Sequence, residues 1–103
     1  IPSEIGLLTN LISLDYNNNN FAGTLPTEIG SFTDLTRLTI YNNTITGPLP
    51  SEIGLMTSLE LFWCHYNMLT GTIPSEIGLL TGLNFLDLVD SNFTGTIPSE
   101  IGL

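Results

Sequence analysis

The sequence repeats with a period of 24 residues, and this period restricts the possible folds more than any other feature. The heptapeptide IPSEIGL begins at residues 1, 73 and 97, and close variants begin at residues 25 and 49. One such segment presents only about eight inward apolar side chains and cannot enclose a core alone. Successive segments must therefore stack, which predicts one repeat array of about four coils over residues 1–103.

Apolar residues recur at the same phase of every repeat and predict the interior of the coil. They alternate with other residues over 14–16, 38–40 and 86–88, as in short strands whose side chains point alternately in and out. Stacked coils would align these strands in a parallel sheet. The predicted core columns are Leu11, Leu35, Leu59 and Leu83, then Leu14, Leu38, Phe62 and Leu86, then Tyr16, Ile40, Cys64 and Leu88.

Three asparagines follow the predicted strands where the chain turns. An asparagine amide both donates and accepts hydrogen bonds, so it can join backbone groups of adjoining coils. The sequence predicts a structural asparagine ladder of Asn19, Asn43 and Asn67. Ser91 interrupts this ladder in the fourth coil, where a shorter hydroxyl can satisfy fewer partners.

The Pro-Ser-Glu segments predict short 3₁₀-like turns on the back of the coil. A Ser or Thr before Glu is a helix-start signal, and the glycine two residues after each Glu limits the helix to about one turn. The glutamates are expected to stay solvated at the positive ends of these turns, although such a row also offers oxygen ligands to a cation such as Ca²⁺. The helix-start residues are Ser3, Thr27, Ser51, Ser75 and Ser99, followed by Glu4, Glu28, Glu52, Glu76 and Glu100.

These columns resemble the plant-type leucine-rich repeat, whose pattern is L-x-x-L-x-L-x-x-N-x-L-x-G-x-I-P-x-x-I/L-G. The second coil reads LTRLTIYNNTITGPLPSEIG from Leu35 to Gly54, and the resemblance extends over the whole chain. Phe62 and Cys64 depart from aliphatic strand residues, and Ser91 departs from Asn. The resemblance implies an α/β repeat solenoid, a right-handed superhelix with a concave parallel sheet and short 3₁₀ or helical turns on the convex side.

Members of this family include receptor-kinase ectodomains, receptor-like proteins and secreted inhibitors of plants, with related arrays in algae. They bind proteins, peptides or glycans, mostly on the concave side. The resemblance therefore implies an extracellular, cell-surface or cell-wall recognition module. Neither family cap is present and the sequence begins and ends at the same phase, so we expect a window of a longer array or a unit that stacks end to end.

Charge and hydropathy exclude two classes of partner. Ten acidic residues accompany one basic residue, Arg37, and the formal net charge is −9. A field of this sign repels nucleic acid, which we exclude as a partner. No apolar run in the sequence reaches the ~18 residues of a membrane-spanning helix, so no membrane segment is predicted within this chain.

Residues that alternate with the core columns are predicted to face outward on the concave side. Because strands lie about 4.8 Å apart, the aromatic residues among them would fall within two or three coils. Clustered exposed aromatic residues indicate a contact site, although cross-strand aromatic pairs can also serve only to stabilise a sheet. The candidate ligand-binding patch comprises Arg37, Thr39, Tyr41, Leu61, Trp63, His65, Tyr66, Phe85 and Asp87.

The sequence predicts a chain that is not an enzyme and uses no cofactor. Cys64 and His65 are adjacent, but neighbours in a strand point to opposite faces, so they cannot act as nucleophile and base. His65 has no second His or Cys with which to hold a metal ion. Asp15 and Asp87 share a column but would lie about 14 Å apart, too far for a glycosidase pair.

Threonines are predicted to form a second outward face. Regular threonine arrays occur on ice-binding solenoids, and dense hydroxyls can carry glycans, although the repeat pattern itself favours Ser or Thr at these positions. Asn42 and Asn92 stand in Asn-x-Thr sequons and are candidates for N-glycosylation. The face comprises Thr70, Thr72, Thr94 and Thr96, expected in register with Ala22, Thr24, Thr46 and Pro48.

Three functions remain open at the level of sequence. The first is recognition of a protein, peptide or glycan on the concave face. The second is a structural role, in which arrays self-associate into a fibrous, glycosylated or wall-associated assembly. The third is ice binding through the threonine face.

Overall fold

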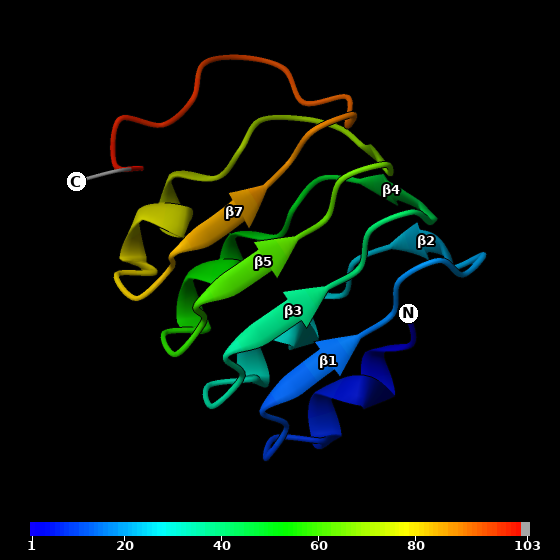
Figure 1. Ribbon diagram of the computed structural model, residues 1–103, viewed down its shortest axis with the longest axis vertical. Helices are drawn as coiled ribbons and strands as arrows, with labels where there is room; N and C mark the ends of the chain where they lie inside the picture. The colour runs from blue at the N-terminus through cyan, green and yellow to red at the C-terminus, as the bar shows by residue number, and fades with distance from the viewer. Residues whose placement is uncertain (102–103) are drawn as a thin grey trace.

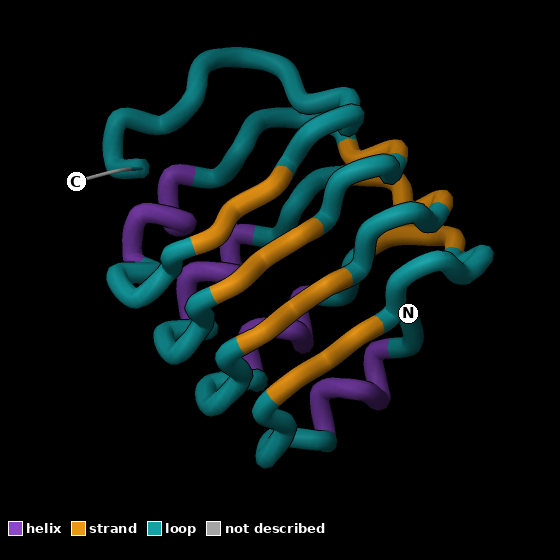
Figure 2. The backbone as a smooth tube through the Cα atoms, in the orientation of Figure 1, coloured by secondary structure: helices purple, strands orange, loops and turns teal. Residues whose placement is uncertain are grey.

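The computed structural model describes residues 1–101 as a solenoid of stacked coils (Figure 1). The molecule measures 32 × 26 × 19 Å along its principal axes. Each coil passes from a 3₁₀ helix to a strand and then returns along the far side (Figure 2). This arrangement confirms the predicted repeat fold.

The first strand of each coil contributes to the sheet that we call the concave sheet. Its members run parallel in the order β1-β3-β5-β7. Paired residues lie one repeat apart, so that Leu14 is opposite Leu38 and Leu38 is opposite Phe62. The strands are β1 (Ser13–Asp15), β3 (Arg37–Thr39), β5 (Leu61–Trp63) and β7 (Phe85–Asp87).

Short 3₁₀ helices form the convex side, as predicted, but the Ser and Thr hydroxyls do not cap them. The residue before each helix is a proline, whose fixed φ suits the entry to a turn, and its carbonyl accepts the first hydrogen bond, for example from the Ile5 N–H at 3.2 Å. None of these four helices has a side-chain cap. The helices are η1 (Ser3–Leu7), η2 (Thr27–Ser31), η3 (Ser51–Leu55) and η4 (Ser75–Leu79).

The glycine in each 3₁₀ helix allows successive coils to approach closely. A Cβ atom added to Gly30 would lie 2.9 Å from the backbone oxygen of Glu52, and one added to Gly54 would lie 2.9 Å from that of Glu76. Such contacts are too short for carbon and oxygen, so any side chain would push the coils apart. Glycine is therefore required here by packing between coils.

A second parallel sheet, which the sequence did not predict as a sheet, lies on another side of the coil. It contains β2 (Ala22–Thr24), β4 (Thr44–Gly47) and β6 (Met68–Leu69). Its partners are 22 residues apart, as in Thr24 with Thr46 and the isolated bridge of Thr72 with Thr94. The expected register of 24 residues is therefore wrong for this sheet. A shift of two residues keeps the same side chains outward, so the alternation of residue types cannot reveal it.

The core is continuous through the inner coils. Leu35, Leu59 and Phe62 are 0% exposed, which confirms these columns as interior. Leu11 and Leu83, in the same column as Leu59, are only partly buried. Within residues 1–101, the first and fourth coils pack against a complete coil on one side only, which explains this difference.

Two of the three predicted asparagines join neighbouring coils. The Asn67 amide donates to Ile40 O at 2.9 Å and to Cys64 O at 3.0 Å, and its carbonyl oxygen accepts from the Ile45 N–H at 3.0 Å. Asn43 makes the equivalent bonds to the first coil, including one to Tyr16 O at 2.7 Å. Asn19 does not belong to the ladder, because it is exposed and bonds only to Asn17 O of its own coil within the described residues.

Ser91 interrupts the ladder, as predicted. Its Oγ atom is buried and has no hydrogen-bond partner among residues 1–101. A hydroxyl on Cβ is too short to reach the carbonyls and the N–H group that an asparagine side chain reaches in the preceding coils. The fourth coil is therefore attached to the third by fewer polar contacts than the third is to the second.

Candidate ligand-binding face

Outward residues of the concave sheet and the turns that follow it form three parallel rows. Alternation along each strand points Leu38 and Phe62 into the core and their sequence neighbours toward the outer side of the sheet. Each of the three rows runs across all four coils and contains one residue from each coil. They are Ser13, Arg37, Leu61 and Phe85, then Asp15, Thr39, Trp63 and Asp87, then Asn17, Tyr41, His65 and Val89.

Four aromatic side chains meet on this face, and we call Tyr41, Trp63, His65 and Tyr66 the aromatic cluster. The Tyr41 and His65 rings are stacked, with centroids 4.5 Å apart and planes 8° apart. The Trp63 ring is tilted by about 60° to both, with its centroid 6.3 Å from Tyr41 and 6.5 Å from His65. Tyr66 meets His65 edge-on at 5.2 Å. The cluster thus presents ring faces and ring edges on two adjacent coils.

Two carboxylates border the cluster in the row that contains Trp63. Asp87 lies on the neighbouring strand, and its Oδ2 atom is 3.3 Å from His65 Nδ1. That contact lacks hydrogen-bond geometry, since His65 Nδ1 has no hydrogen-bond partner within residues 1–101. The Asp87 Oδ1 atom accepts from the Val89 N–H at 3.0 Å, and Asp15 Oδ1 accepts from the Asn17 N–H at 3.2 Å. Both carboxylates are therefore oriented by their own turns.

Thr39 is not available to a ligand, contrary to the sequence-based expectation. It lies on the outer side of β3 but is only 1% exposed. Asp15 and Trp63 are opposite it on the two adjacent strands, and the Asn17 amide donates to its hydroxyl at 3.0 Å. The bulky Trp63 on one side and Asp15 with Asn17 on the other therefore cover this small side chain.

The other predicted patch residues remain accessible. Arg37 is exposed, Leu61 is partly buried and Phe85 is 60% exposed. Phe85 is opposite Leu61, one row away from Trp63, and extends the apolar part of the face toward the fourth coil. The accessible patch therefore consists of the aromatic cluster with Arg37, Leu61, Phe85 and Asp87.

Tyr66 has a backbone conformation that a tyrosine seldom adopts. Its φ is +52°, in the left-handed region, and the equivalent residues Asn18, Asn42 and Asp90 have φ of +55°, +57° and +52°. Asn and Asp tolerate this region because their short polar side chains can bond locally, whereas a bulky residue is strained there. The Tyr66 side chain is 56% exposed and contacts His65. The strained backbone therefore places the ring on the surface and does not contribute to core packing.

Replacing Tyr66 with asparagine should raise the free energy of unfolding by about 0.5–1 kcal/mol, because the left-handed conformation costs asparagine less. Urea denaturation followed by circular dichroism measures the change. The reciprocal variant Asn42→Tyr should lower stability by a similar amount, since it places the bulky ring in the same conformation one coil earlier. A loss of stability in Tyr66→Asn would show that the contact with His65 outweighs the backbone strain.

Comparison with protein families matches residues 10–32, 34–56, 58–80 and 82–103 to the description Leucine Rich Repeat. The chain belongs to the leucine-rich repeat family. A sequence comparison with curated proteins found no significant match. The four matched segments follow the period of the repeat and include the strands of the concave sheet.

Solved leucine-rich repeat structures superpose closely on this chain. The plant peptide hormone receptor RGFR1 in complex with RGF2 is 40% identical, with a TM-score of 0.96 over 98% of this chain and 16% of its own. The Arabidopsis receptor kinase HAESA, in complex with the peptide hormone IDA and the co-receptor SERK1, is 37% identical, with a TM-score of 0.95 over 98% and 17%. A plant ice-binding protein is 31% identical, with a TM-score of 0.93 over 99% and 33%. The chain therefore spans a third or less of the length of these three proteins.

The cysteine of this leucine-rich repeat chain is not placed for nucleophilic chemistry. Cys64 is 0% exposed. Burial raises the pKa of its thiol, and the negative charge of Asp87 raises it further, so the thiol stays protonated at neutral pH. Within residues 1–101, no group of three or more His, Cys, Asp or Glu side chains is arranged to hold a metal ion. No helix in that part of the chain is long and apolar enough to cross a bilayer.

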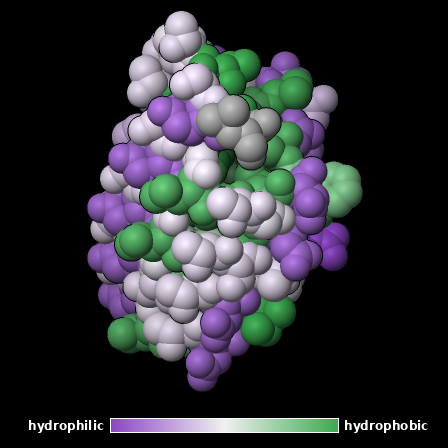
Figure 3. Space-filling view, turned by 90° about the vertical axis from the view of Figure 1, so that its left-hand side faces the viewer, coloured by the Kyte–Doolittle hydropathy of each residue, from purple (hydrophilic) through white to green (hydrophobic). Residues whose placement is uncertain are grey.

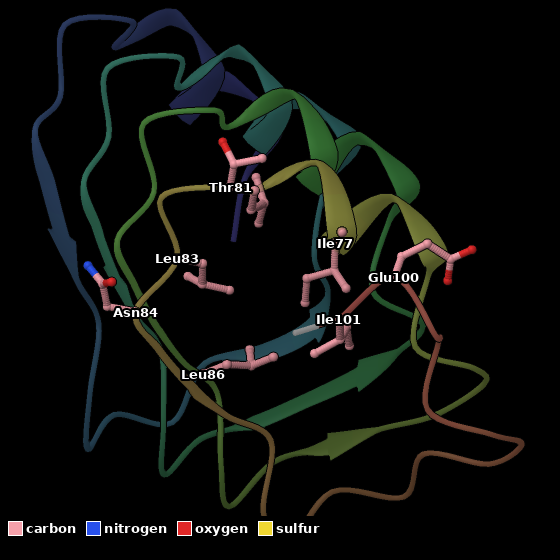
Figure 4. A pocket seen from close by; sticks show the side chains of 9 residues that line it. Ile77, Thr81, Leu83, Asn84, Leu86, Glu100 and Ile101 are labelled. Carbon is pink, nitrogen blue, oxygen red and sulfur yellow. The ribbon is translucent and has the colours of Figure 1, made fainter. Parts of the chain in front are cut away.

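A cavity of about 220 Å³ lies at the end of the fourth coil (Figure 4). Leu83, Leu86 and Ile101 point into it, whereas the Glu100 carboxylate points away. The equivalent positions in the third coil, Leu59 and Phe62, are covered by the coil that follows. The apolar part of the cavity wall is thus a continuation of the solenoid core, and Thr81 and Asn84 also line it.

Exposed apolar residues are not restricted to the concave face. Figure 3 shows a neighbouring side of the molecule, where hydrophobic side chains gather in the middle and hydrophilic ones occupy the borders. Elsewhere, Leu7 on the convex side is 80% exposed, and Leu55 is 56% exposed. Apolar exposure by itself therefore does not identify a binding site. The mutual ring contacts and the strained Tyr66 distinguish the aromatic cluster from these other residues.

The remaining sequence candidates lie on the surface. Asn42 and Asn92, the N-glycosylation candidates, are both exposed, and their occupancy stays a prediction. Most outward threonines of the second sheet are exposed, although Thr46 is partly buried and Met68 lies opposite it. The glutamate row is solvated to differing degrees, with Glu4, Glu28 and Glu100 exposed and Glu52 and Glu76 partly buried.

Proposed function

We propose that this chain is a non-catalytic, extracellular recognition module that binds a peptide across the aromatic cluster of its concave face. The observation that carries the proposal is the contact among Tyr41, Trp63, His65 and Tyr66 on an exposed sheet, with Tyr66 in a strained conformation. Aromatic side chains of this kind contribute most to protein–protein contacts. Two of the similar structures are a plant peptide hormone receptor in complex with RGF2 and a receptor kinase in complex with the peptide hormone IDA, which supports the extracellular setting and the class of ligand.

The shape of the patch favours a peptide over a flat sugar ring. Tyr41 and His65 cover one face of each other, so of these three rings only Trp63 is free of parallel stacking and could take a pyranose on its face. Trp63 is tilted to that stack and Tyr66 meets His65 edge-on, so the cluster presents aromatic surface in several directions, which suits the varied side chains of an extended peptide. Arg37 on one coil and Asp87 two coils away supply opposite charges for polar contacts at the margins of the patch.

Trp63→Ala should weaken binding of a selected peptide by about 2 kcal/mol or more, which is roughly 30-fold in Kd. A random 12-residue peptide library, displayed on phage and selected on the chain, supplies the probes, and titration calorimetry measures affinity. Leu55→Ala, which removes an exposed apolar side chain from the convex side, is the matched control and should leave Kd unchanged. Chitohexaose, a neutral glycan, should not bind measurably.

Two results would overturn this function. Selected peptides that bind Trp63→Ala as tightly as the unmodified chain would place their site elsewhere. Binding of chitohexaose that is lost in Trp63→Ala, without any selected peptide that depends on Trp63, would assign the face to glycans.

A second candidate function, ice binding, is favoured by one observation. Threonines of the second sheet pair across coils, as in Thr24 with Thr46 and Thr72 with Thr94, and a plant ice-binding protein is similar in structure. Met68 interrupts the array, so we place this function second. Thermal hysteresis that falls in Thr72→Tyr but persists in Trp63→Ala would establish it, and absence of hysteresis would exclude it.

A further inference from the structure

The charges around the aromatic cluster are unevenly distributed. Asp15 and Asp87 occupy the same row as Trp63, and Asp90 follows shortly after β7. Arg37 is the one basic residue of the chain, and it lies in a different row. Since the formal net charge is −9, the long-range field around this face attracts cations and repels anions.

We propose that the group recognised by the aromatic cluster is a cation, namely an arginine or lysine side chain of a peptide ligand, held against Trp63 and paired with Asp87. This inference rests on the proposed peptide-binding function and specifies the chemistry of the ligand. It requires a ring that a cation can approach and a carboxylate within reach of the same cation. The structure provides both on strands that are paired to each other.

Trp63 and Asp87 are suitably placed for this role. They are directly opposite each other on β5 and β7, so a cation over the indole is also close to the carboxylate. The faces of Trp and Tyr rings attract cations within about 6 Å of the ring centroid, and Trp does so most strongly. The indole is partly exposed, and its plane is tilted by about 60° to the Tyr41 and His65 rings, so neither of these rings stacks parallel on it.

The Asp87 carboxylate is already oriented to accept a hydrogen bond from a cationic side chain, without movement of the backbone. Its side chain is 38% exposed, and the Val89 N–H holds Oδ1, which leaves Oδ2 directed toward the cluster. The neighbouring His65 Nδ1 is close to Oδ2 but forms no hydrogen bond with it. A guanidinium or ammonium group would supply the missing donor, and charge-assisted bonds of this kind are stronger than neutral ones.

A peptide anchored by a carboxylate is the main alternative. Such a ligand would need Arg37, which is exposed at the margin of the patch. Its anionic group would then approach Asp15 and Asp87 as well as the net charge of −9. The electrostatic balance therefore favours the cationic ligand, and the experiment below separates the two.

The test uses three 12-residue Gly-Ser peptides with a central Arg-Tyr-Arg, citrulline-Tyr-citrulline or Glu-Tyr-Glu, in which citrulline is the neutral counterpart of arginine with nearly the same shape and glutamate supplies the opposite charge. We expect the arginine peptide to bind at least about tenfold more tightly than the citrulline peptide, and the glutamate peptide to bind most weakly. Trp63→Ala should abolish the binding of the arginine peptide. Asp87→Asn should reduce its advantage over citrulline to about threefold or less.

The control variant is Glu52→Gln, which lies on the convex side of the solenoid. It changes the net charge by the same amount as Asp87→Asn, so a specific pairing predicts that it leaves the affinity unchanged. The amide of Asp87→Asn keeps an oxygen for the Val89 N–H, so the turn should remain folded, and circular dichroism checks this. An equal loss in both variants would show a general field effect and would overturn the assignment of Asp87.

Two outcomes separate the cationic assignment from the proposed peptide-binding function. If selected peptides lose affinity in Trp63→Ala but the citrulline or glutamate probe binds as well as the arginine probe, the face binds peptides and the cationic assignment is wrong. If no probe and no selected peptide depends on Trp63, the proposed function is wrong as well.

Discussion

Replacing Leu59 with alanine should lower the free energy of unfolding by about 2–5 kcal/mol. Leu59 is 0% exposed and lies in the column of Leu35 and Leu83, so its truncation removes buried apolar surface and leaves a cavity between coils. A small solenoid has little stability in reserve, because domains of this size are stabilised by only about 5–15 kcal/mol. Urea denaturation monitored by circular dichroism measures the change.

The control for this prediction is another leucine in the same coil. Leu55 is 56% exposed on the convex side, so Leu55→Ala should change stability by about 0.5 kcal/mol or less. A loss below about 0.5 kcal/mol in Leu59→Ala would contradict the interior position of this column. An equal loss in both variants would mean that burial does not govern stability in this array.

Replacing Asn67 with alanine should lower the free energy of unfolding by about 3 kcal/mol or more. The substitution removes the acceptor of the Ile45 N–H and the donor to Ile40 O, two backbone groups of the preceding coil. Each buried polar group that loses its partner costs about 1–3 kcal/mol. Asn19→Ala is the control, because Asn19 is exposed and donates to its own coil, and its change should stay within about 0.5 kcal/mol.

The reverse change at Ser91, which introduces an asparagine, also tests whether the ladder amides stabilise the contact between coils. Ser91→Asn should raise the free energy of unfolding by about 1 kcal/mol, because an amide could reach the positions that Asn43 and Asn67 reach in their coils. The 22-residue offset of the Asn43 and Asn67 bonds makes the Leu69 N–H the expected donor to its oxygen. Loss of stability in Ser91→Asn would show that the fourth coil cannot accommodate an asparagine side chain at this position. The contribution of the ladder to stability would then be tested by Asn67→Ala.

Sequence periodicity predicted the coil, the concave strands and the 3₁₀ turns because each repeat experiences nearly the same surroundings. Leu35, Leu59 and Phe62 fall in columns that must be interior in any stacked array, and all three are fully buried. The alternation around Trp63 likewise placed it on the outer side of its strand. The aromatic residues of the patch could be grouped for the same reason, since equal phase in adjacent coils means proximity in space.

Positions where the repeats differ were less predictable. The burial of Thr39 depends on the residues opposite it, Asp15 and Trp63, which belong to other coils. Asn19 bonds only within its own coil among the described residues, because residues 1–101 do not include an earlier coil with the backbone groups that Asn43 and Asn67 reach. The positive φ at one position of each coil could have been predicted from the sequence, because three of the four residues there, Asn18, Asn42 and Asp90, are of types enriched in the left-handed region. Tyr66, at the same position of the third coil, would then have stood out as the exception.

The period, the interior columns and the outward rows could be predicted from the sequence, because they follow from alternation within one coil and its repetition. Only the tertiary structure decided the slanted second sheet, in which Thr24 lies beside Thr46, because a shift of two residues preserves inward and outward positions. The tertiary structure also decided the stacking of Tyr41 on His65 and the approach of Asp87 to His65. Those contacts depend on side-chain directions across neighbouring coils, which a repeated one-dimensional pattern does not contain.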